Sequence, residues 1–166
     1  MKQMELLGIR IELQGNVPVA ILREMEGSRA LPIYIGGPEA RAIAEALEGH
    51  VPARPMTHDL LRDVLGETGF RVVRVDITEL QRHTFFAEIE LAGDESVHRI
   101  SSRPSDAIAL AVRCGSPIFA DDDVLDEAGI PDFQDVADER DDENDIELVD
   151  EFKRFIEEVA PEDFAN

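Results

Sequence analysis

Three short segments of the sequence combine charged or hydroxyl side chains with a predicted helix start. They are residues 54–59 (RPMTHD), residues 103–106 (RPSD) and residues 35–39 (IGGPE). The first turn of a helix presents free backbone N–H groups and the positive end of the helix dipole, and both attract anions. An adjacent arginine strengthens such a site because its guanidinium group binds phosphate. The three segments are therefore candidates for anion or phosphate binding.

The titratable residues of these segments also have simpler explanations. Asp59 and Asp106 suit the first turn of a helix, where the dipole favours an acid. His58 could act as a general base or a metal ligand, but a single histidine beside a helix start is more often structural or exposed. Asp59, Asp63 and Glu67 share one helix face and could hold a divalent cation. A solvated acidic face is the simpler interpretation of that spacing.

The residues around these segments follow two kinds of periodicity. Alternation of apolar and polar residues predicts strands, at residues 7–13, 17–22, 30–35, 73–78, 85–91, 96–100 and 117–120. Helical spacing predicts three helices, which begin near Pro38, Thr57 and Pro104, and a shorter helix at residues 121–129. We therefore expect an α+β domain over residues 1–130, with a mixed or antiparallel sheet of about six or seven strands and three packed helices.

Individual residues predict further details of the helices. Thr57 is a suitable N-cap, because its hydroxyl can accept a free N–H of the first turn. The apolar face of that helix is expected to consist of Leu60, Leu61, Val64 and Leu65. Residues 107–112 are all apolar, so the helix that contains them should be buried nearly all round. Gly115 is suited to end this helix, and Cys114 is expected to be a core residue rather than a nucleophile.

One internal similarity is present. Residues 42–47 (AIAEAL) resemble residues 107–112 (AIALAV), and each stretch follows three predicted strands and a proline-initiated helix start. One hypothesis is a weak duplication of a unit of three strands and a helix. The alternative is that alanine-rich packing helices resemble one another through composition alone, and the sequence leaves both open.

The acidic charge of the chain is concentrated near its C-terminal end. The 166 residues carry a formal charge of −21, from 37 acidic and 16 basic residues. Residues 1–120 hold 17 acidic and 13 basic side chains, a net of −4, whereas residues 121–166 hold 20 and 3, a net of −17. Nucleic-acid binding favours a basic footprint. The charge therefore argues against nucleic acid for the C-terminal part and not for the nearly neutral body.

The C-terminal part divides into two predicted segments. Residues 131–147 are dense in Asp and Glu and lack apolar periodicity, which predicts an acidic linker. Residues 148–166 are predicted to form an amphipathic helix and a tail. The apolar face of this helix is too narrow to stabilise it in isolation, so we expect it to dock on its own domain or on a protein partner.

Cysteine content and hydropathy indicate the compartment. Cys114 is the single cysteine, which excludes an intrachain disulfide. The first residues lack the apolar region of a signal peptide, and no apolar run approaches the ~20 residues that span a bilayer. We expect a cytoplasmic protein without a membrane partner.

Four segments resemble one known family in their order and spacing. They are LPIYIGGPEARAIAEALEG, RPMTHDLLRDVL, TFFAEIEL and RPSDAIALAVRCGSPIFA. Together they resemble the bifunctional nuclease domain family over about residues 4–130, and the chain with its tail looks most like the actinobacterial members. The resemblance implies a compact α+β domain, with DNase and RNase activity in some members, so DNA or RNA is an expected partner.

The resemblance carries over eight motif positions, which are Glu39, Arg54, Thr57, His58, Asp59, Arg103, Ser105 and Asp106. Phosphodiester hydrolysis needs an activated water and stabilisation of the charge on phosphorus, usually with a divalent cation. We expect His58, Asp59 and Asp106 to be catalytic, with His58 or Asp59 orienting or deprotonating the water. Glu39 and Asp106 are the expected ligands of a Mg²⁺ or Mn²⁺ ion.

The other four motif positions, Arg54, Thr57, Arg103 and Ser105, are expected to bind phosphate. The two arginines would clamp it, and the helix starts at Thr57 and Ser105 would add N–H donors. This mechanism requires residues 57–59 and 103–106 to meet in space. Many family members have an acid where this chain has Ser101, so a metal ligand at that position would be missing here.

Two other classes of function stay open. In the first, the same motifs are only fold determinants, and the domain is a non-enzymatic oligomeric module that regulates a partner. In the second, the helix starts bind a small anion or nucleotide as a sensor. The composition includes one Tyr and no Trp, which gives little platform for stacking bases. Edge strands in a small sheet also lead us to expect a homo-oligomer.

Overall fold

The computed structural model describes residues 1–12, 15–94 and 96–131. These residues form eight strands and four helices. In chain order they are β1 (Lys2–Glu12), β2 (Val17–Glu24), β3 (Arg29–Tyr34), α1 (Gly37–Leu47), α2 (Thr57–Glu67), β4 (Arg71–Gln81), β5 (Thr84–Ala92), β6 (Val97–Ser102), α3 (Pro104–Cys114), β7 (Ile118–Ala120), α4 (Asp122–Ala128) and β8 (Ile130–Pro131). The predicted helix at 148–166, and the predicted linker beyond its first residue, lie outside the described residues.

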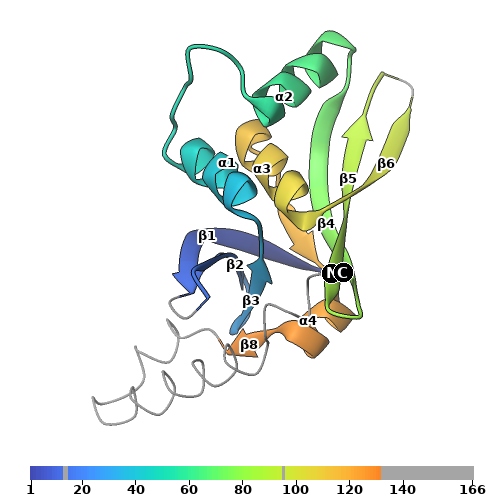
Figure 1. Cartoon of the computed structure of the whole chain (residues 1–166). Helices are drawn as coiled ribbons and strands as arrows, with labels where there is room; N and C mark the ends of the chain where they lie inside the picture. The colour runs from blue at the N-terminus through green and yellow to red at the C-terminus, as the bar shows by residue number, and fades with distance from the viewer. Residues whose placement is uncertain (13–14, 95, 132–166) are drawn as a thin grey trace.

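The strands of the described residues form one mixed sheet in the order β6-β5-β4-β7-β1-β2-β3-β8 (Figure 1). Neighbours are antiparallel except β4 and β7, which run parallel with Val75 opposite Ile118. The short β7 also pairs with β1, where Met4 lies opposite Ile118, and so joins the two halves of the sheet. This confirms the expected α+β class. The two-residue β8 is the strand that the alternation does not predict.

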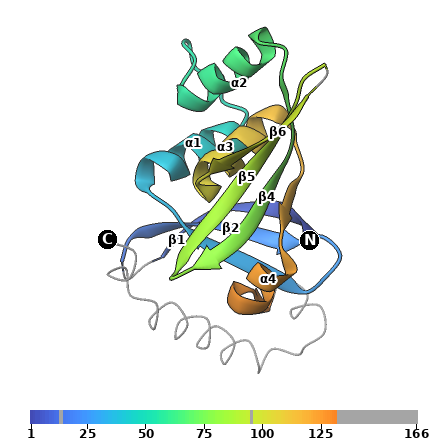
Figure 2. The ribbon, with the colours of Figure 1, turned by 90° about the vertical axis from the view of Figure 1, so that its right-hand side faces the viewer.

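The helices divide between two regions of the molecule. α1 packs on β1 and β2, α3 packs on β4 and β5, and α2 packs on α3. α4 lies against β3 and β4, at the end of the molecule away from α2 in both ribbon views (Figures 1 and 2). No helix among the described residues has both the length and the apolar character needed to cross a bilayer.

α3 is the most buried helix and confirms the prediction made for it. Residues 107–111 are each at most 1 % exposed. Gly115 follows the helix in the left-handed conformation, with φ of 64°, as a glycine C-cap requires. Cys114 packs against the core, and burial raises the pKa of its thiol. This environment agrees with the expected core role.

The start of α2 differs from the prediction by one residue. Met56 is the N-cap and Thr57 is the first helical residue, so the expectation of a Thr57 cap is wrong. The backbone N–H of Met56 instead donates to Oδ2 of Asp59 at 3.0 Å. The carboxylate of Asp59 in the first turn therefore accepts a capping hydrogen bond at this helix start, where a threonine hydroxyl was expected to accept one.

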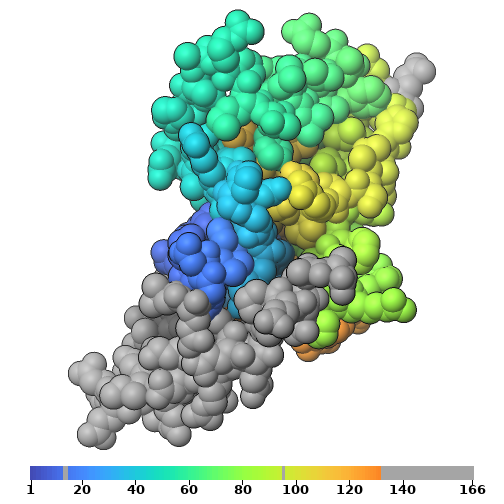
Figure 3. Space-filling model, in the orientation of Figure 1, coloured from blue at the N-terminus to red at the C-terminus, as the bar shows by residue number. Residues whose placement is uncertain are grey.

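The predicted apolar face of α2 is mostly exposed. Leu60, Leu61 and Val64 are 56 %, 40 % and 48 % exposed, and Leu65 is the member of the predicted face that packs against the core. The physical reason is that α2 packs on α3 rather than on the sheet, so one narrow side of it is covered. In the space-filling view the teal and green segment that includes α2 forms the top of the molecule (Figure 3).

The order of elements repeats along the chain. β1, β2 and β3 form an antiparallel meander that leads into α1. β4, β5 and β6 form a second meander that leads into α3, and α2 stands between the two units. This order agrees with the hypothesis of a duplicated unit of three strands and a helix.

Candidate functional site

Two of the predicted motif segments meet in space. His58 lies in the first turn of α2 and Asp106 in the first turn of α3, 48 residues later. Nε2 of His58 and Oδ1 of Asp106 are 3.1 Å apart. The His58 side chain is 11 % exposed and that of Asp106 is 30 % exposed, so the pair lies at the edge of the interior. The packing of α2 on α3 brings the two residues together.

The third segment, residues 35–39, joins the same group because its Glu39 contacts Arg103, the N-cap residue of α3. Nε of Arg103 donates to Oδ2 of Asp106 at 2.7 Å, and Nη1 of Arg103 lies 3.1 Å from Oε1 of Glu39. Glu39 belongs to the first turn of α1. Three helix starts therefore converge, and we call Glu39, His58, Arg103 and Asp106 the helix-start cluster.

The contacts within the helix-start cluster set the pKa of the Asp106 carboxyl. Burial alone would raise the pKa of Asp106, but hydrogen bonds from Arg103 and His58, and the charge of Arg103, outweigh it and lower that pKa. The same hydrogen bond with Asp106 raises the pKa of Arg103. Asp106 is therefore ionised at neutral pH. The guanidinium group, whose side chain is 66 % exposed, is held between two carboxylates.

Asp59 lies outside this cluster, although it is the next residue after His58. Its Oδ1 accepts a hydrogen bond of 2.7 Å from Nε of Arg113, in the last turn of α3. Burial would raise the pKa of Asp59, but the bonds from Arg113 and from the Met56 N–H outweigh it and hold that pKa below its usual value. Asp59 thus ties α2 to the C-terminal end of α3.

The remaining predicted phosphate-binding residues are less closely connected. Arg54 and Thr57 are exposed, and neither has an ion pair or side-chain hydrogen bond among residues 1–12, 15–94 and 96–131. Ser105 is 7 % exposed, so little of its surface is open to a ligand. Of the four predicted phosphate-binding residues, Arg103 is the one that the described contacts connect to His58 and Asp106.

The acids of the cluster do not form a metal site in this arrangement. Both carboxylate oxygens of Asp106 are engaged, by His58 and by Arg103, and Glu39 contacts the same arginine. Across the described part of the chain, no group of three or more His, Cys, Asp or Glu side chains could hold a metal ion. The assignment of Glu39 and Asp106 as ligands of a Mg²⁺ or Mn²⁺ ion stays a prediction.

Arg113 is a buried charged residue beside the site that the sequence predictions missed. Its side chain is 5 % exposed, and its Nη1 donates to the carbonyl oxygen of Ala109 at 2.9 Å. The sequence did contain a sign that this arginine is buried. Arg113 directly follows the six apolar residues 107–112 in the same helix. A buried arginine needs an acidic partner, but the sequence offered no means of choosing Asp59.

Fold and site together define an α+β domain with a polar site at the meeting point of three helix starts. The chain belongs to the bifunctional nuclease domain family, whose family model matches residues 20–132. This agrees with the resemblance in the motif segments.

Individual relatives fall into two groups. An uncharacterized protein of Mycobacterium tuberculosis is 43 % identical over 168 residues, which covers 99 % of this chain and 98 % of that protein. Bifunctional nuclease 2 of Arabidopsis thaliana is 33 % identical over 114 residues, or 63 % of this chain and 35 % of the plant protein. Bifunctional nuclease 1 of the same plant is 29 % identical over 105 residues, or 61 % and 32 %. The match thus covers about a third of the plant proteins.

Proposed function

We propose that this protein hydrolyses phosphodiester bonds in DNA and RNA at the helix-start cluster. The observation that carries the proposal is the hydrogen bond between His58 and Asp106, which joins two motif segments 48 residues apart. A histidine held by a carboxylate is a recurrent general base. The names of the plant relatives support the choice of a nuclease reaction.

His58 is the proposed general base. Its Nε2 faces Asp106, which fixes the orientation of the ring and leaves Nδ1 to take a proton from water. The oxygen of that water forms a bond to phosphorus as the bond to the leaving oxygen breaks. The leaving oxygen takes its proton from solvent, and Nδ1 of His58 releases its proton to solvent. Such positioned proton transfer contributes a factor of about 10² to 10⁴ in rate.

Arg103 is the proposed phosphate ligand. Its Nε and Nη1 face Asp106 and Glu39, and its Nη2 has no partner among the described residues. The two carboxylates hold the guanidinium group in place, and Nη2 can donate to a non-bridging phosphate oxygen. The start of α3 adds backbone N–H groups and the helix dipole to the stabilisation of the developing charge.

A cleavage assay with active-site variants tests this proposal. Highly purified protein is incubated with single-stranded DNA and RNA oligonucleotides, in EDTA and separately in Mg²⁺ or Mn²⁺. We expect the His58→Gln and Asp106→Asn variants to cleave at least about 100-fold more slowly than the wild type. The Asp94→Asn variant changes an exposed acid in the β5–β6 turn and should keep full activity.

Comparing cleavage in EDTA with cleavage in Mg²⁺ or Mn²⁺ distinguishes a metal-independent reaction from a metal-dependent one. Cleavage in EDTA is expected if the side chains of the cluster suffice, whereas cleavage only with a divalent cation would require a metal brought with the substrate. Equal rates in the wild type and both cluster variants would contradict the proposal. A wild type that cleaves neither substrate would also contradict it and would favour the non-enzymatic module.

A further inference from the structure

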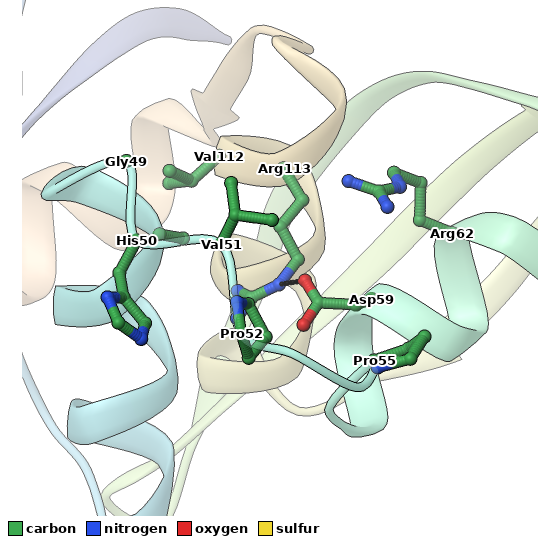
Figure 4. A pocket seen from close by; sticks show the side chains of 10 residues that line it. Gly49, His50, Val51, Pro52, Pro55, Asp59, Arg62, Val112 and Arg113 are labelled. Carbon is green, nitrogen blue, oxygen red and sulfur yellow. Dashed lines mark hydrogen bonds and ion pairs between the residues drawn. The ribbon is translucent and has the colours of Figure 1, made fainter.

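A second polar site lies beside the start of α2. It is a pocket of about 270 Å³ between the end of α1, the loop that follows it, α2 and the last turn of α3 (Figure 4). Asp59 lines this pocket, whereas the preceding residue, His58, contacts the helix-start cluster. Asp106 and Arg113 are seven residues apart on α3, about 10 Å along a helix. The pocket is therefore separate from the cluster.

Two arginines line the pocket, and each of them is paired with one acid. Arg62 and Arg113 line it, together with His50, and Asp59 is the one acid among the lining residues. That acid is already paired, because Arg113 donates to it at 2.7 Å. Figure 4 shows the Arg113 guanidinium group against the Asp59 carboxylate, with Arg62 at the edge of the pocket. Arg62 pairs instead with Asp63, which is not a lining residue of the pocket.

Both arginines keep a donor that the protein does not use. The Arg113 side chain is 5 % exposed, and its Nε and Nη1 donate to Asp59 and to the carbonyl oxygen of Ala109. Its Nη2 has no partner among the described residues. Arg62 donates from Nε and Nη2 to Oδ1 of Asp63, and its Nη1 is likewise without a partner in the described part of the chain. These two nitrogens can donate hydrogen bonds to an anion in the pocket.

The other walls of the pocket are apolar. Val51, Pro52 and Pro55 come from the loop after α1, and Val112 comes from α3. Val51 is 87 % exposed, which is unusual for a valine and leaves its surface free to cover a ligand. The pocket therefore combines donors for an anion with apolar surface for the remainder of a small molecule.

We propose that this pocket binds a small molecule that carries a phosphate group, of the size of a nucleoside monophosphate. The phosphate accepts hydrogen bonds from Nη1 of Arg62 and Nη2 of Arg113. The less polar part of the ligand packs against Val51 and the two prolines. The pocket takes no part in the proposed cleavage reaction, so binding there does not depend on that activity.

Isothermal titration calorimetry with the full chain tests the proposal. The probes are adenosine monophosphate, inorganic phosphate and adenosine. We expect the monophosphate to bind more tightly than inorganic phosphate and adenosine to bind least. The Arg62→Gln variant should weaken binding of the monophosphate at least about tenfold, because it removes a charged hydrogen bond. The Arg10→Gln variant makes the same change at an exposed residue of β1 and should bind as the wild type does.

Two further variants make the result specific. Arg113→Lys keeps the positive charge but loses the planar arrangement of donors of the guanidinium group. It should lower the affinity for the monophosphate. A thermal melting curve of this variant shows whether the fold is kept. His58→Gln should bind the monophosphate as the wild type does, which separates this site from the proposed active site.

Three outcomes would overturn the proposal. One is the absence of binding by both phosphate-bearing probes. Another is an affinity for the monophosphate that Arg62→Gln leaves unchanged. The third is that an oligonucleotide displaces the monophosphate, binds much more tightly and depends on Arg62 in the same way. The pocket would then be part of a nucleic-acid binding surface.

Discussion

His58 and Asp59 are neighbours in the sequence, yet they bind opposite ends of one helix. His58 contacts Asp106 in the first turn of α3, and Asp59 contacts Arg113 in its last turn. The two contacts have different consequences. The first is partly open to solvent and belongs to the proposed active site, whereas the second is more buried and holds α2 on α3.

Asp59 should contribute to stability in a pH-dependent way. Its pKa in the folded protein is lowered, so its contribution is present above the unfolded pKa of about 4 and is lost as the pH falls through the folded value. We expect Asp59→Asn to lower the free energy of unfolding by about 2 kcal/mol at pH 7. Urea unfolding at pH 7 and at pH 3 should show this difference shrinking in acid.

The control for this prediction is Asp63→Asn. Asp63 pairs with Arg62 at the surface, where both side chains are nearly half exposed, so the loss should stay within about 0.5 kcal/mol. A difference between Asp59→Asn and the wild type that is equally large at both pH values would contradict the account of the ion pair.

The sequence allowed us to predict which residues belong to the candidate site, but not which of them contact one another. Glu39, His58, Arg103 and Asp106 all stand at helix starts, and local patterns identify helix starts. Which acid each arginine contacts depends on how α1, α2 and α3 pack, and this packing is a long-range property. Arg113 was missed for the same reason, because its partner is 54 residues away.

At the scale of elements, the glycine that ends α3 could be predicted, whereas the N-cap and the covered face of α2 could not. Gly115 ends α3 as expected, since a left-handed residue is a local requirement. The face of α2 was misjudged, because its apolar stripe indicates which side could pack and not whether a neighbour is there. The strands followed from alternation, but the parallel pairing of β4 with β7 joins segments far apart in the chain.

A pair of glycines tests the helix ends directly. Gly115 has a φ of 64° and Gly66, in the last turn of α2, does not have a positive φ; a Cβ would meet nothing within 4 Å at either position. Gly115→Ala should therefore lower the free energy of unfolding by about 1 kcal/mol through backbone strain alone. Gly66→Ala should raise it by about 0.5 to 1 kcal/mol, because alanine favours the helix. Chemical denaturation measures both, and equal effects of the two substitutions would refute this reasoning.

At the scale of the whole molecule, the charge is unevenly divided along the chain. Residues 132–166 hold 15 acidic and 3 basic side chains, a net of −12. We expect such a charge to repel nucleic acid or to cover a cationic site. Because β8 ends at Pro131 and pairs with β3, a chain that stops after this residue keeps every strand of the described sheet.

We expect that shortened chain to bind a single-stranded oligonucleotide more tightly than the full chain. The improvement should be about threefold or more at 50 mM salt and should shrink as salt is added, because the repulsion is screened. Fluorescence anisotropy measures the affinity, and circular dichroism checks that the fold is kept. Binding that is unchanged or weaker after the deletion would contradict the assigned role of the acidic residues.

The central claim is that His58 and Asp106 act as one unit on a phosphodiester bond. A double-mutant cycle tests it most directly, with kcat/KM for oligonucleotide cleavage measured in the wild type, His58→Gln, Asp106→Asn and the double variant. Because a base and the group that orients it are not additive, the double variant should be no more than about threefold slower than the slower single variant. Losses that multiply in the double variant, or a single variant that keeps full activity, would contradict the claim.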